Sequence, residues 1–425
     1  MNKIRILFFI VPVLIISGNR GFSQEMNWTH FRGSHLDCIS EEKNAPLSWS
    51  DSLNIRWKAD IEGKGWSSPV VFGNQVWVTT ATPDGKWLKA VCIDFTTGRE
   101  LYNLLLFEPV KLQGKHAINT FATPTCCIEK GFVYVTFGTY GTACINTING
   151  QKVWERTDLN CLHVQGSGSS LMLYKDLLIV HCEGTDQQYI VGLDKATGKT
   201  LWRADRPKEL YDPLLPIGKK AYVTPIIVKV NGKDLLISNG SAVCIAYDPE
   251  TGSEVWRFVQ GEDSTIAMPF SEGGIVYFIT SFVTPKEGNK YAELIAVKPD
   301  GTGDIAGSHV VWRKKLPVIQ LLTPLIKDGL IYMVDTENNL LCIDAENGNE
   351  VYRHKMKSKY NSSPVYAGGN IYFTSVKGET MVVKQGRNLE IISENRLSGE
   401  VFATPAILRK VILVRTDKSL FCVSD

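Results

Sequence analysis

The sequence has almost no net charge, and this excludes several classes of partner. Its 425 residues include 46 lysines and arginines against 44 aspartates and glutamates, for a formal net charge of +2. The basic residues are scattered along the chain and form no cluster. Nucleic acids and anionic membrane surfaces attract proteins through clustered basic side chains. We therefore expect neither of them as a partner.

Several nucleotide, haem and nucleophile motifs are also missing. The segment 197–200 ends like a phosphate-binding loop, but Leu193 stands where that motif needs its first glycine. Gly166 and Gly168 are not followed by the third glycine of a dinucleotide fingerprint. The chain contains no Cys-x-x-Cys-His for c-type haem and no serine-nucleophile elbow. These chemistries are not expected.

Long apolar runs are absent apart from one near the N-terminus. Lys3 and Arg5 precede the apolar residues 6–16, and the small residues Gly21 and Ser23 follow. The run is too short to span a bilayer, so it predicts a cleaved signal peptide over residues 1–23. An uncleaved anchor is the alternative. The first cysteine is Cys38, so no lipid-attachment cysteine is predicted, and we expect a soluble protein in the periplasm or secreted.

A unit that recurs eight times dominates the rest of the chain. The typical unit has a Ser/Thr-Pro-type start, two apolar strands, an Asp-x-x-x-Gly turn and an aromatic residue four positions later, and the turn deviates in the units that start at Pro269 and Pro364. The starts fall at Pro69, Pro124, Ser169, Pro225, Pro269, Pro324, Pro364 and Pro405. Repeats of this length with several short strands predict a β-propeller.

The turn motif explains one hairpin in each unit. In Asp94–Gly98 and Asp194–Gly198, the aspartate can accept hydrogen bonds from the backbone two residues on, and the glycine supplies a positive φ. The aromatic residues that follow, Tyr102 and Trp202, fall on the outermost strand. Because large rings dominate burial energetics, we expect them to pack between neighbouring blades.

The last unit stops at Asp425 without an outermost strand, and residues 54–60 with Trp57 can supply it. Such closure removes two bare sheet edges. We therefore predict an all-β, eight-bladed propeller of four-stranded antiparallel blades, closed by an N-terminal strand that completes the last blade. The expected organisation is a signal peptide over 1–23, an N-terminal extension over 24–53 and the propeller over 54–425.

Ten cysteines would suggest disulfides in an exported protein. However, Cys92, Cys144, Cys342 and Cys422 occupy the same position of the repeat, two residues before its Asp-like position in most units. Copies of one position, spaced around a ring, cannot pair with one another. We interpret them as small buried apolar residues.

The residues just before each start are expected to line the mouth of the central channel. The main candidates from the first three blades are Trp66, His116, His163 and Gln165. Further candidates for the mouth are Lys64, Thr120, Lys219, Lys220, Thr265, Gln320, Tyr360 and Asn361.

His181, Glu183 and Asp186 lie at a strand end and loop of the third blade. Histidines and carboxylates from neighbouring blades could bind a metal or act as acid and base. The alternative is a set of ordinary polar residues, which the lack of metal-ligand spacing favours. No metal site is identified from the sequence.

Cys126 and Cys127 are adjacent at the start of an innermost strand. They could form a vicinal disulfide only in an oxidising compartment, which export would supply. Strand alternation would direct one sulfur towards the channel, where it suits a planar ligand, and the next into the blade. The alternative is two unpaired core residues, because alternation works against bridging neighbours.

The Ser/Thr-Pro start and the Asp-x-x-Thr-Gly-x-x-x-Trp turn resemble the pyrroloquinoline-quinone-binding-like (quinoprotein-like) propeller repeats. The resemblance covers essentially the whole mature chain, including Trp28–Gly33 and Phe137–Thr142. This family includes quinoprotein alcohol dehydrogenases, in which a vicinal disulfide covers the quinone and a carboxylate–amide set holds calcium. Cys126-Cys127 resembles that pair, whereas no calcium ligand or catalytic aspartate is identifiable by motif. The family also includes an outer-membrane assembly scaffold lipoprotein, whose lipid-attachment cysteine this chain lacks.

The resemblance implies two main hypotheses. The first is an exported, monomeric binding protein that serves the cell envelope or extracellular polysaccharide metabolism. It would bind an envelope protein, a glycan or a small planar ligand. The alternative is a dehydrogenase that uses pyrroloquinoline quinone (PQQ) with calcium to oxidise a sugar or an alcohol. A third option is a carbohydrate-active enzyme that uses channel histidines and carboxylates.

Overall fold

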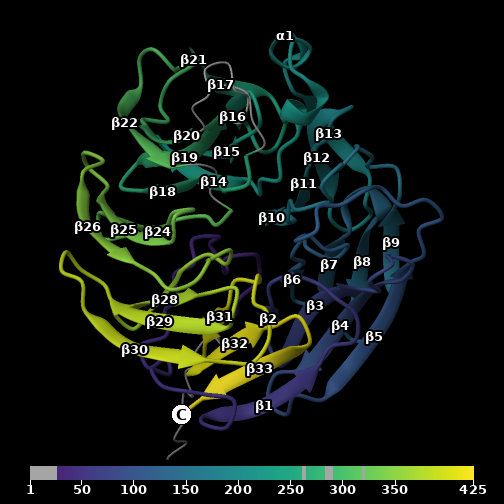
Figure 1. Ribbon diagram of the computed structural model, residues 1–425. Coiled ribbons are helices and arrows are strands. Elements are labelled where there is room, and N and C mark those ends of the chain that lie inside the picture. Colours follow the sequence, from purple (N-terminus) through teal and green to yellow (C-terminus); the bar gives the residue numbers. More distant parts are fainter. Residues whose placement is uncertain (1–25, 261–264, 283–290, 318–320) are drawn as a thin grey trace, which may run out of the picture.

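The computed structural model describes residues 26–260, 265–282, 291–317 and 321–425. The predicted signal peptide and Gln320 lie outside these residues. Eight sheets stand around a central axis (Figure 1), and they confirm the predicted eight-bladed propeller. Each sheet is antiparallel from its inner to its outer strand, as expected for strands joined by short hairpins.

The strands of blades 1 to 8 follow from the innermost to the outermost. Blade 1 contains β2 (Val70–Phe72), β3 (Gln75–Ala81), β4 (Leu88–Asp94) and β5 (Glu100–Phe107), and blade 2 contains β6 (Cys127–Glu129), β7 (Phe132–Thr136), β8 (Thr142–Asn146) and β9 (Lys152–Arg156). Blade 3 contains β10 (Met172–Tyr174), β11 (Leu177–Glu183), β12 (Gln188–Asp194) and β13 (Thr200–Asp205), and blade 4 contains β14 (Ile226–Val230), β15 (Lys233–Ser238), β16 (Val243–Tyr247) and β17 (Glu254–Val259). Blade 5 contains β18 (Phe270–Glu272), β19 (Ile275–Phe282), β20 (Tyr291–Val297) and β22 (Val310–Pro317), and blade 6 contains β23 (Leu325–Lys327), β24 (Leu330–Val334), β25 (Asn339–Asp344) and β26 (Glu350–Lys355). Blade 7 contains β27 (Val365–Ala367), β28 (Asn370–Thr374), β29 (Glu379–Lys384) and β30 (Ile391–Arg396), and blade 8 contains β31 (Ala406–Leu408), β32 (Val411–Arg415), β33 (Ser419–Ser424) and β1 (Ile55–Asp60).

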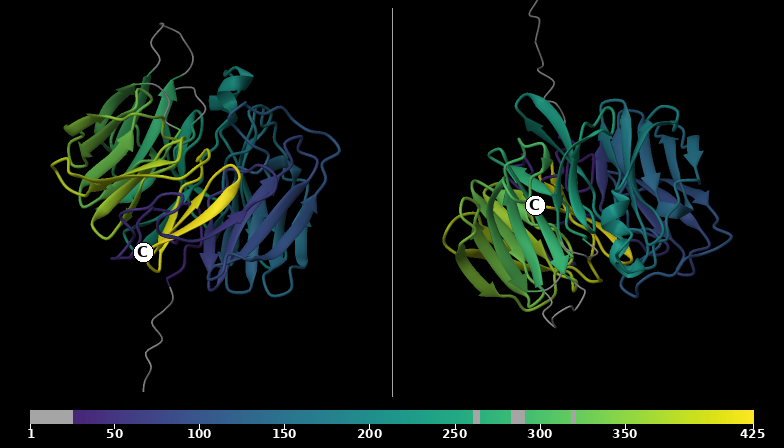
Figure 2. Two further views of the ribbon diagram at one scale, coloured as in Figure 1. Left: turned by 60° about the horizontal axis from the view of Figure 1, so that its bottom comes forward. Right: turned by 90° about the horizontal axis from the view of Figure 1, so that it is seen from above.

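Two features depart from simple repetition. The strand β1 pairs antiparallel with β33, so the two ends of the propeller share blade 8, and purple and yellow strands lie side by side there (Figures 1 and 2). The longer hairpin of blade 5 contains β21 (Gly303–Asp304), which pairs in parallel with β17 and gives blade 4 a fifth strand.

Helix is scarce in the part of the chain that the structure describes. It consists of α1 (Lys208–Tyr211) and two 3₁₀ turns, η1 (Gly138–Tyr140) and η2 (Pro216–Lys219). No helix among the described residues has both the length and the apolar character that a bilayer crossing requires.

The aromatic residues of the repeat pack between blades, as predicted. Trp154 of blade 2 donates a hydrogen bond from Nε1 to the carbonyl of Lys195 in the turn of blade 3, at 2.9 Å. The turn glycine Gly198 has a φ of +72°, and a Cβ there would lie 2.7 Å from the Trp154 ring. Only glycine therefore permits both the turn and the close approach of the ring.

A ring of hydroxyl groups ties the inner strands together at their starts. The backbone N–H two positions before seven of the eight inner strands donates to a Ser or Thr hydroxyl of the next blade, which links blade 8 back to blade 1 as well. The accepting hydroxyls, at 2.9–3.3 Å, belong to Thr125, Ser170, Thr224, Thr323, Ser363, Thr404 and Ser68. Between blades 4 and 5 the link is missing, because Met268 carries no hydroxyl.

This ring corrects the predicted starts of blades 2 and 3. Thr125 and Ser170 occupy the positions that precede proline in most other blades, so Cys126 and Leu171 stand in the proline position. The predicted starts Pro124 and Ser169 are therefore two residues too early. The error arises because neither blade has a proline at the true position.

Residues 28–40 form a segment that we call the plug, because it runs along the inner edges of several blades. Trp28 pairs with Val71 of β2, and Thr29 accepts from the N–H of Ile128 in β6. The Arg32 guanidinium, 1% exposed, donates to the carbonyls of Thr323 and Pro324 at 2.8 Å. Backbone groups of inner strands thereby find partners that an open channel would not provide.

Candidate functional site

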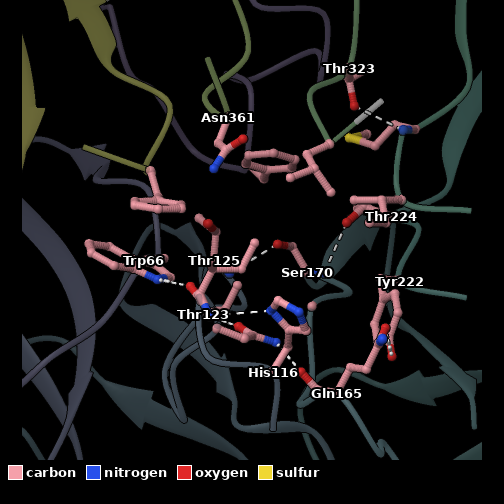
Figure 3. Close-up of a pocket in the computed structure, with 18 of the residues that line it drawn as sticks. Trp66, His116, Thr123, Thr125, Gln165, Ser170, Tyr222, Thr224, Thr323 and Asn361 are labelled. Atoms are coloured by element: carbon pink, nitrogen blue, oxygen red, sulfur yellow. Dashed lines mark hydrogen bonds between the residues drawn. The ribbon is translucent and has the colours of Figure 1, made fainter. Parts of the chain in front are cut away.

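An axial cavity of about 440 Å³ lies between the plug and the loops that enter the inner strands. Its described lining consists of Phe31 from the plug and, from the blades and their entry loops, Trp66, Ser68, His116, Ile118, Asn119, Thr123, Thr125, Gln165, Gly168, Ser170, Ile217, Gly218, Lys220, Tyr222, Thr224, Ile266, Met268, Leu321, Thr323, Asn361, Ser363, Phe402 and Thr404. The size is typical of small-molecule sites, which measure roughly 300–1,000 Å³. Figure 3 shows its side chains around an open centre.

The loops that lead into blades 2 and 3 bring the two channel-mouth candidates His116 and Gln165 together at the cavity. The His116 N–H donates to the Gln165 carbonyl at 3.1 Å. The Asn119 amide nitrogen donates to the same carbonyl at 2.8 Å. The imidazole Nδ1 of His116 accepts from the Ile118 N–H at 3.3 Å, which leaves Nε2 as its second polar atom. Both side chains line the cavity (Figure 3).

Trp66 also lines the cavity, and its ring is held on several sides. It stacks on Phe402 with ring centroids 4.3 Å apart, and its Nε1 donates to the Ile118 carbonyl at 2.8 Å. The ammonium of Lys64 lies 5.0 Å from the ring centroid, where a cation–π attraction operates. Trp66 and Phe402 therefore form a rigid aromatic wall.

Asn361 lies across the open centre from His116 and Gln165 (Figure 3). Its side-chain amide makes no hydrogen bond to another described residue. An amide offers two donors and an acceptor, so Asn361 presents unused hydrogen-bonding capacity to the cavity.

The loop 206–224 contributes Lys220 and Tyr222 to the lining. Lys220 is 1% exposed, and its ammonium lies 5.5 Å from the centroid of the Tyr222 ring. The same loop begins at Arg206, whose guanidinium is buried against Glu183 with an Nε–Oε2 distance of 3.2 Å. The buried ion pair thus anchors the loop that forms this wall.

His163 does not reach the cavity, which corrects its prediction as a channel residue. It is 5% exposed, and its Nε2 lies 3.0 Å from the Cys161 sulfur between blades 2 and 3. Burial, with the nearby His181, lowers the pKa of His163 from 6.5 to about 4. The imidazole is therefore neutral at physiological pH and packs as part of the wall behind the cavity.

His181, Glu183 and Asp186 also lie outside the cavity. His181 Nε2 is 2.7 Å from Glu183 Oε2, and both side chains are completely buried. Burial alone would raise the pKa of Glu183, but the charge of Arg206 and the hydrogen bond from His181 outweigh it, so the pKa is lowered. Tyr211 donates to the second oxygen of Glu183.

Asp186 instead accepts from the N–H groups of Leu162 and Gln187. Within the described ranges, no group of three or more histidine, cysteine or acidic side chains is arranged to hold a metal. Glu183 is fully occupied by its partners and acts as the anchor of the neighbouring loop.

The two adjacent cysteines face different interiors and both thiols are free. Cys126 packs in the core between blades 1 and 2, and its sulfur lies 3.8 Å from the Trp77 carbonyl. Cys127 packs with Cys144 and Leu178 between blades 2 and 3. Neither lines the cavity, contrary to the expectation of a channel-facing sulfur. Successive side chains of a strand point to the two faces of its blade, and these faces pack against the two neighbouring blades.

The dehydrogenase alternative requires a calcium site beside the cavity. Calcium prefers six to eight oxygen ligands with carboxylates among them. The described residues that line the cavity include no aspartate or glutamate. They do not fit a calcium–quinone site, and they offer no carboxylate pair for glycoside hydrolysis.

Sequence reasoning missed the hydroxyl ring and Phe31. The residues before the prolines were visible as a repeated Ser or Thr, which was the available signal for the ring. No signal in the sequence placed the extension inside the channel, because its contacts with the inner edges of the blades are not periodic.

The chain has recognisable relatives among known families and proteins. Three segments, residues 52–204, 186–302 and 302–390, match the PQQ_2 family, described as outer membrane protein assembly factor BamB. The chain is similar to that assembly factor from Nitrosomonas eutropha, with 27% identity over 31% of each chain. It is also similar to quinohemoprotein alcohol dehydrogenase ADH IIB of Pseudomonas putida, with 23% identity over 53% of this chain. The matches span only 31% and 25% of those relatives' own lengths.

Among solved structures, the chain resembles quinohemoprotein alcohol dehydrogenase from Comamonas testosteroni. The TM-score is 0.67 at 12% identity, over 93% of this chain and 80% of that one. At this identity the likeness shows the propeller fold alone.

Proposed function

Because the chain belongs to the PQQ_2 family of BamB-like propellers, we propose that it is an exported binding protein of the cell envelope. The observation that carries this proposal is the axial cavity itself. It is walled by hydrogen-bonding, aromatic and apolar side chains together with the ammonium-bearing Lys220, and its described lining holds no carboxylate. Such a lining suits recognition of a ligand or of an inserted partner group.

Binding is expected at the open mouth of the cavity, where apolar side chains remain exposed. Ile118, Ile217 and Leu321 line the cavity and are 45%, 50% and 37% exposed. They come from three different entry loops, so a ligand or partner that enters the cavity contacts all three. Burial of these side chains would stabilise the complex.

Site-specific photocrosslinking in cells tests this proposal. A photoreactive amino acid replaces Ile118 at the mouth or, as a control of matched exposure, Val311 on the outer strand β22, which is 42% exposed. We expect the protein in the envelope fraction and an adduct at Ile118 that is absent at Val311. The captured component, once purified and added in excess, should reduce the yield of the Ile118 adduct in vitro. A protein retained in the cytoplasm, or no position-specific adduct, would overturn the proposal.

The PQQ-dependent dehydrogenase is kept as a second candidate because the similarity to ADH IIB covers 53% of this chain. Its test uses the purified mature protein with PQQ and calcium. Thermal stability and dye-linked oxidation of sugars and alcohols are measured together. Ligand binding raises the melting temperature by mass action, so the dehydrogenase requires both a calcium-dependent shift and turnover. We expect neither, since the cavity lining lacks carboxylate ligands.

A further inference from the structure

We propose that the axial cavity binds a saccharide, with one or two sugar rings inside the hydroxyl ring. This inference rests on the proposed binding function and names the ligand of that site. It is carried by three features of the cavity: its unused amide and imidazole groups, its hydroxyls and its aromatic wall.

Three polar side chains from opposite sides of the cavity have hydrogen-bonding capacity left over. Asn361 has both polar atoms of its amide without a partner among the described residues. Within the described part of the chain, His116 bonds through Nδ1 and not Nε2, and Gln165 accepts from Tyr222 at 3.4 Å while its amide nitrogen has no partner. All three line the cavity (Figure 3). Neutral groups that both donate and accept match sugar hydroxyls, which do the same.

The hydroxyl ring adds further groups of the same kind. Each of its seven hydroxyls accepts one backbone N–H, and all seven line the cavity. A hydroxyl retains a proton to donate and a second lone pair after accepting one bond. At the missing link, beside Met268, the Thr224 N–H faces no hydroxyl of the next blade. A ligand oxygen at this point would take the place of the absent hydroxyl.

Apart from Asn119, Thr123 and Lys220, the remaining lining is apolar and partly aromatic. Phe31, Phe402 and Tyr222 contribute aromatic rings to it. A sugar ring has polar edges and an apolar face of C–H groups, so it needs both hydrogen-bonding groups and a flat apolar surface. The lining offers this pair of surfaces within one enclosure. It offers no described carboxylate for a cationic ligand.

The experiment measures thermal stability and calorimetric binding of the full-length mature protein with defined probes. The probes are cellobiose, chitobiose and digalacturonic acid, and benzoate and a neutral tripeptide serve as non-sugar controls. We expect saturable binding of at least one disaccharide and none of the controls. If no disaccharide binds, or if a control binds as well, the saccharide assignment is overturned.

The matched variants are Asn361→Ala, in the cavity, and Asn149→Ala, in an exposed turn of blade 2. Asn361→Ala should weaken disaccharide binding at least about tenfold, the loss that follows from one removed hydrogen-bond group. Its unfolding midpoint should stay unchanged, because the amide has no described partner. Asn149→Ala should bind normally. Equal affinity of both variants would overturn the placement of the sugar beside Asn361.

The outcomes separate this inference from the proposed function. A photocrosslink at Ile118 without disaccharide binding would keep the envelope binding role and remove the saccharide. Failure of both experiments would remove the binding role itself.

Discussion

The backbone N–H of Thr404 donates a 2.9 Å hydrogen bond to the hydroxyl of Ser68. This bond joins the inner strand of the last blade to that of the first, 336 residues away in the sequence. Together with the pairing of β1 and β33, it holds the ends of the ring at both its inner and outer edges. Both residues line the axial cavity, so the same bond shapes the candidate site.

Replacement of Ser68 by alanine should destabilise the closed ring. The variant leaves the buried Thr404 N–H without an acceptor, which costs about 1–3 kcal/mol. Urea unfolding monitored by tryptophan fluorescence measures the change. Ser253→Ala, in the exposed turn of blade 4, is the control and should change stability little. Equal stability of Ser68→Ala and the wild type would show that the ring closes without this bond.

Features that depend on local chemistry could be predicted from the sequence, whereas features that depend on contacts between blades could not. The turns and aromatic residues were predictable because each depends on local chemistry: Asp194 accepts within its own turn, and Gly198 admits Trp154. The inner starts of blades 2 and 3 were misplaced because Cys126 and Leu171 give no proline signal. The predicted direction of the His163 side chain was also wrong, because the loop before β10 turns this side chain to the Cys161 sulfur, between blades 2 and 3, and away from the cavity. Such directions depend on contacts between blades, which one repeat does not encode.

Arg32 should be necessary for the plug to stay in the channel. Its planar guanidinium donates to the Thr323 and Pro324 carbonyls, a two-pronged geometry that lysine cannot reproduce. Arg32→Lys should therefore lower the free energy of unfolding by about 2 kcal/mol. It should also increase protease cleavage within residues 28–40, measured by mass spectrometry.

The matched control for Arg32→Lys is Arg203→Lys, because Arg203 pairs with Asp205 on the surface. Exposed pairs contribute at most about 1 kcal/mol. If both variants are cleaved and unfold alike, the plug does not depend on the buried guanidinium.

Glu183→Gln should loosen the loop 206–224. The substitution leaves the buried Arg206 without its counter-charge, and breaking a buried ion pair in this way costs about 3–5 kcal/mol. Hydrogen exchange should rise around α1, whose Tyr211 bonds to Glu183. The control is Glu250→Gln, which removes an exposed partner of Lys175 and should cost less than about 1 kcal/mol. Unchanged exchange in the loop would contradict the anchoring role.

Thiol counting tests the state of Cys126 and Cys127. All ten cysteines are free and buried in the structure, and burial raises the pKa of Cys126 to about 12. A thiol reagent should therefore react with few groups in the native protein. After denaturation without reductant it should react with all ten. A count two lower, with the missing pair mapped to one peptide, would establish the vicinal disulfide.

Acid should weaken the contact between the plug and blade 3 through His30. The Nε2 of His30 accepts from the Leu173 N–H at 3.2 Å, which requires an unprotonated ring nitrogen. Burial, reinforced by His35, lowers the pKa of His30 from 6.5 to about 4. Between these values the unfolded chain binds a proton that the folded protein does not. Stability should therefore fall as the pH drops from about 6.5 to 4, by about 3 kcal/mol for this residue.

Unfolding free energies measured from pH 7 to pH 4 check this dependence. His163 has a similarly lowered pKa, so the wild-type slope should contain two such contributions. The variant His30→Gln should lose about half of it, and the double variant with His163→Gln should lose most of the remainder. If His30→Gln keeps the full wild-type slope, the plug contact does not titrate in this range. A loss of slope that appears only with His163→Gln would assign the acid sensitivity to the wall behind the cavity.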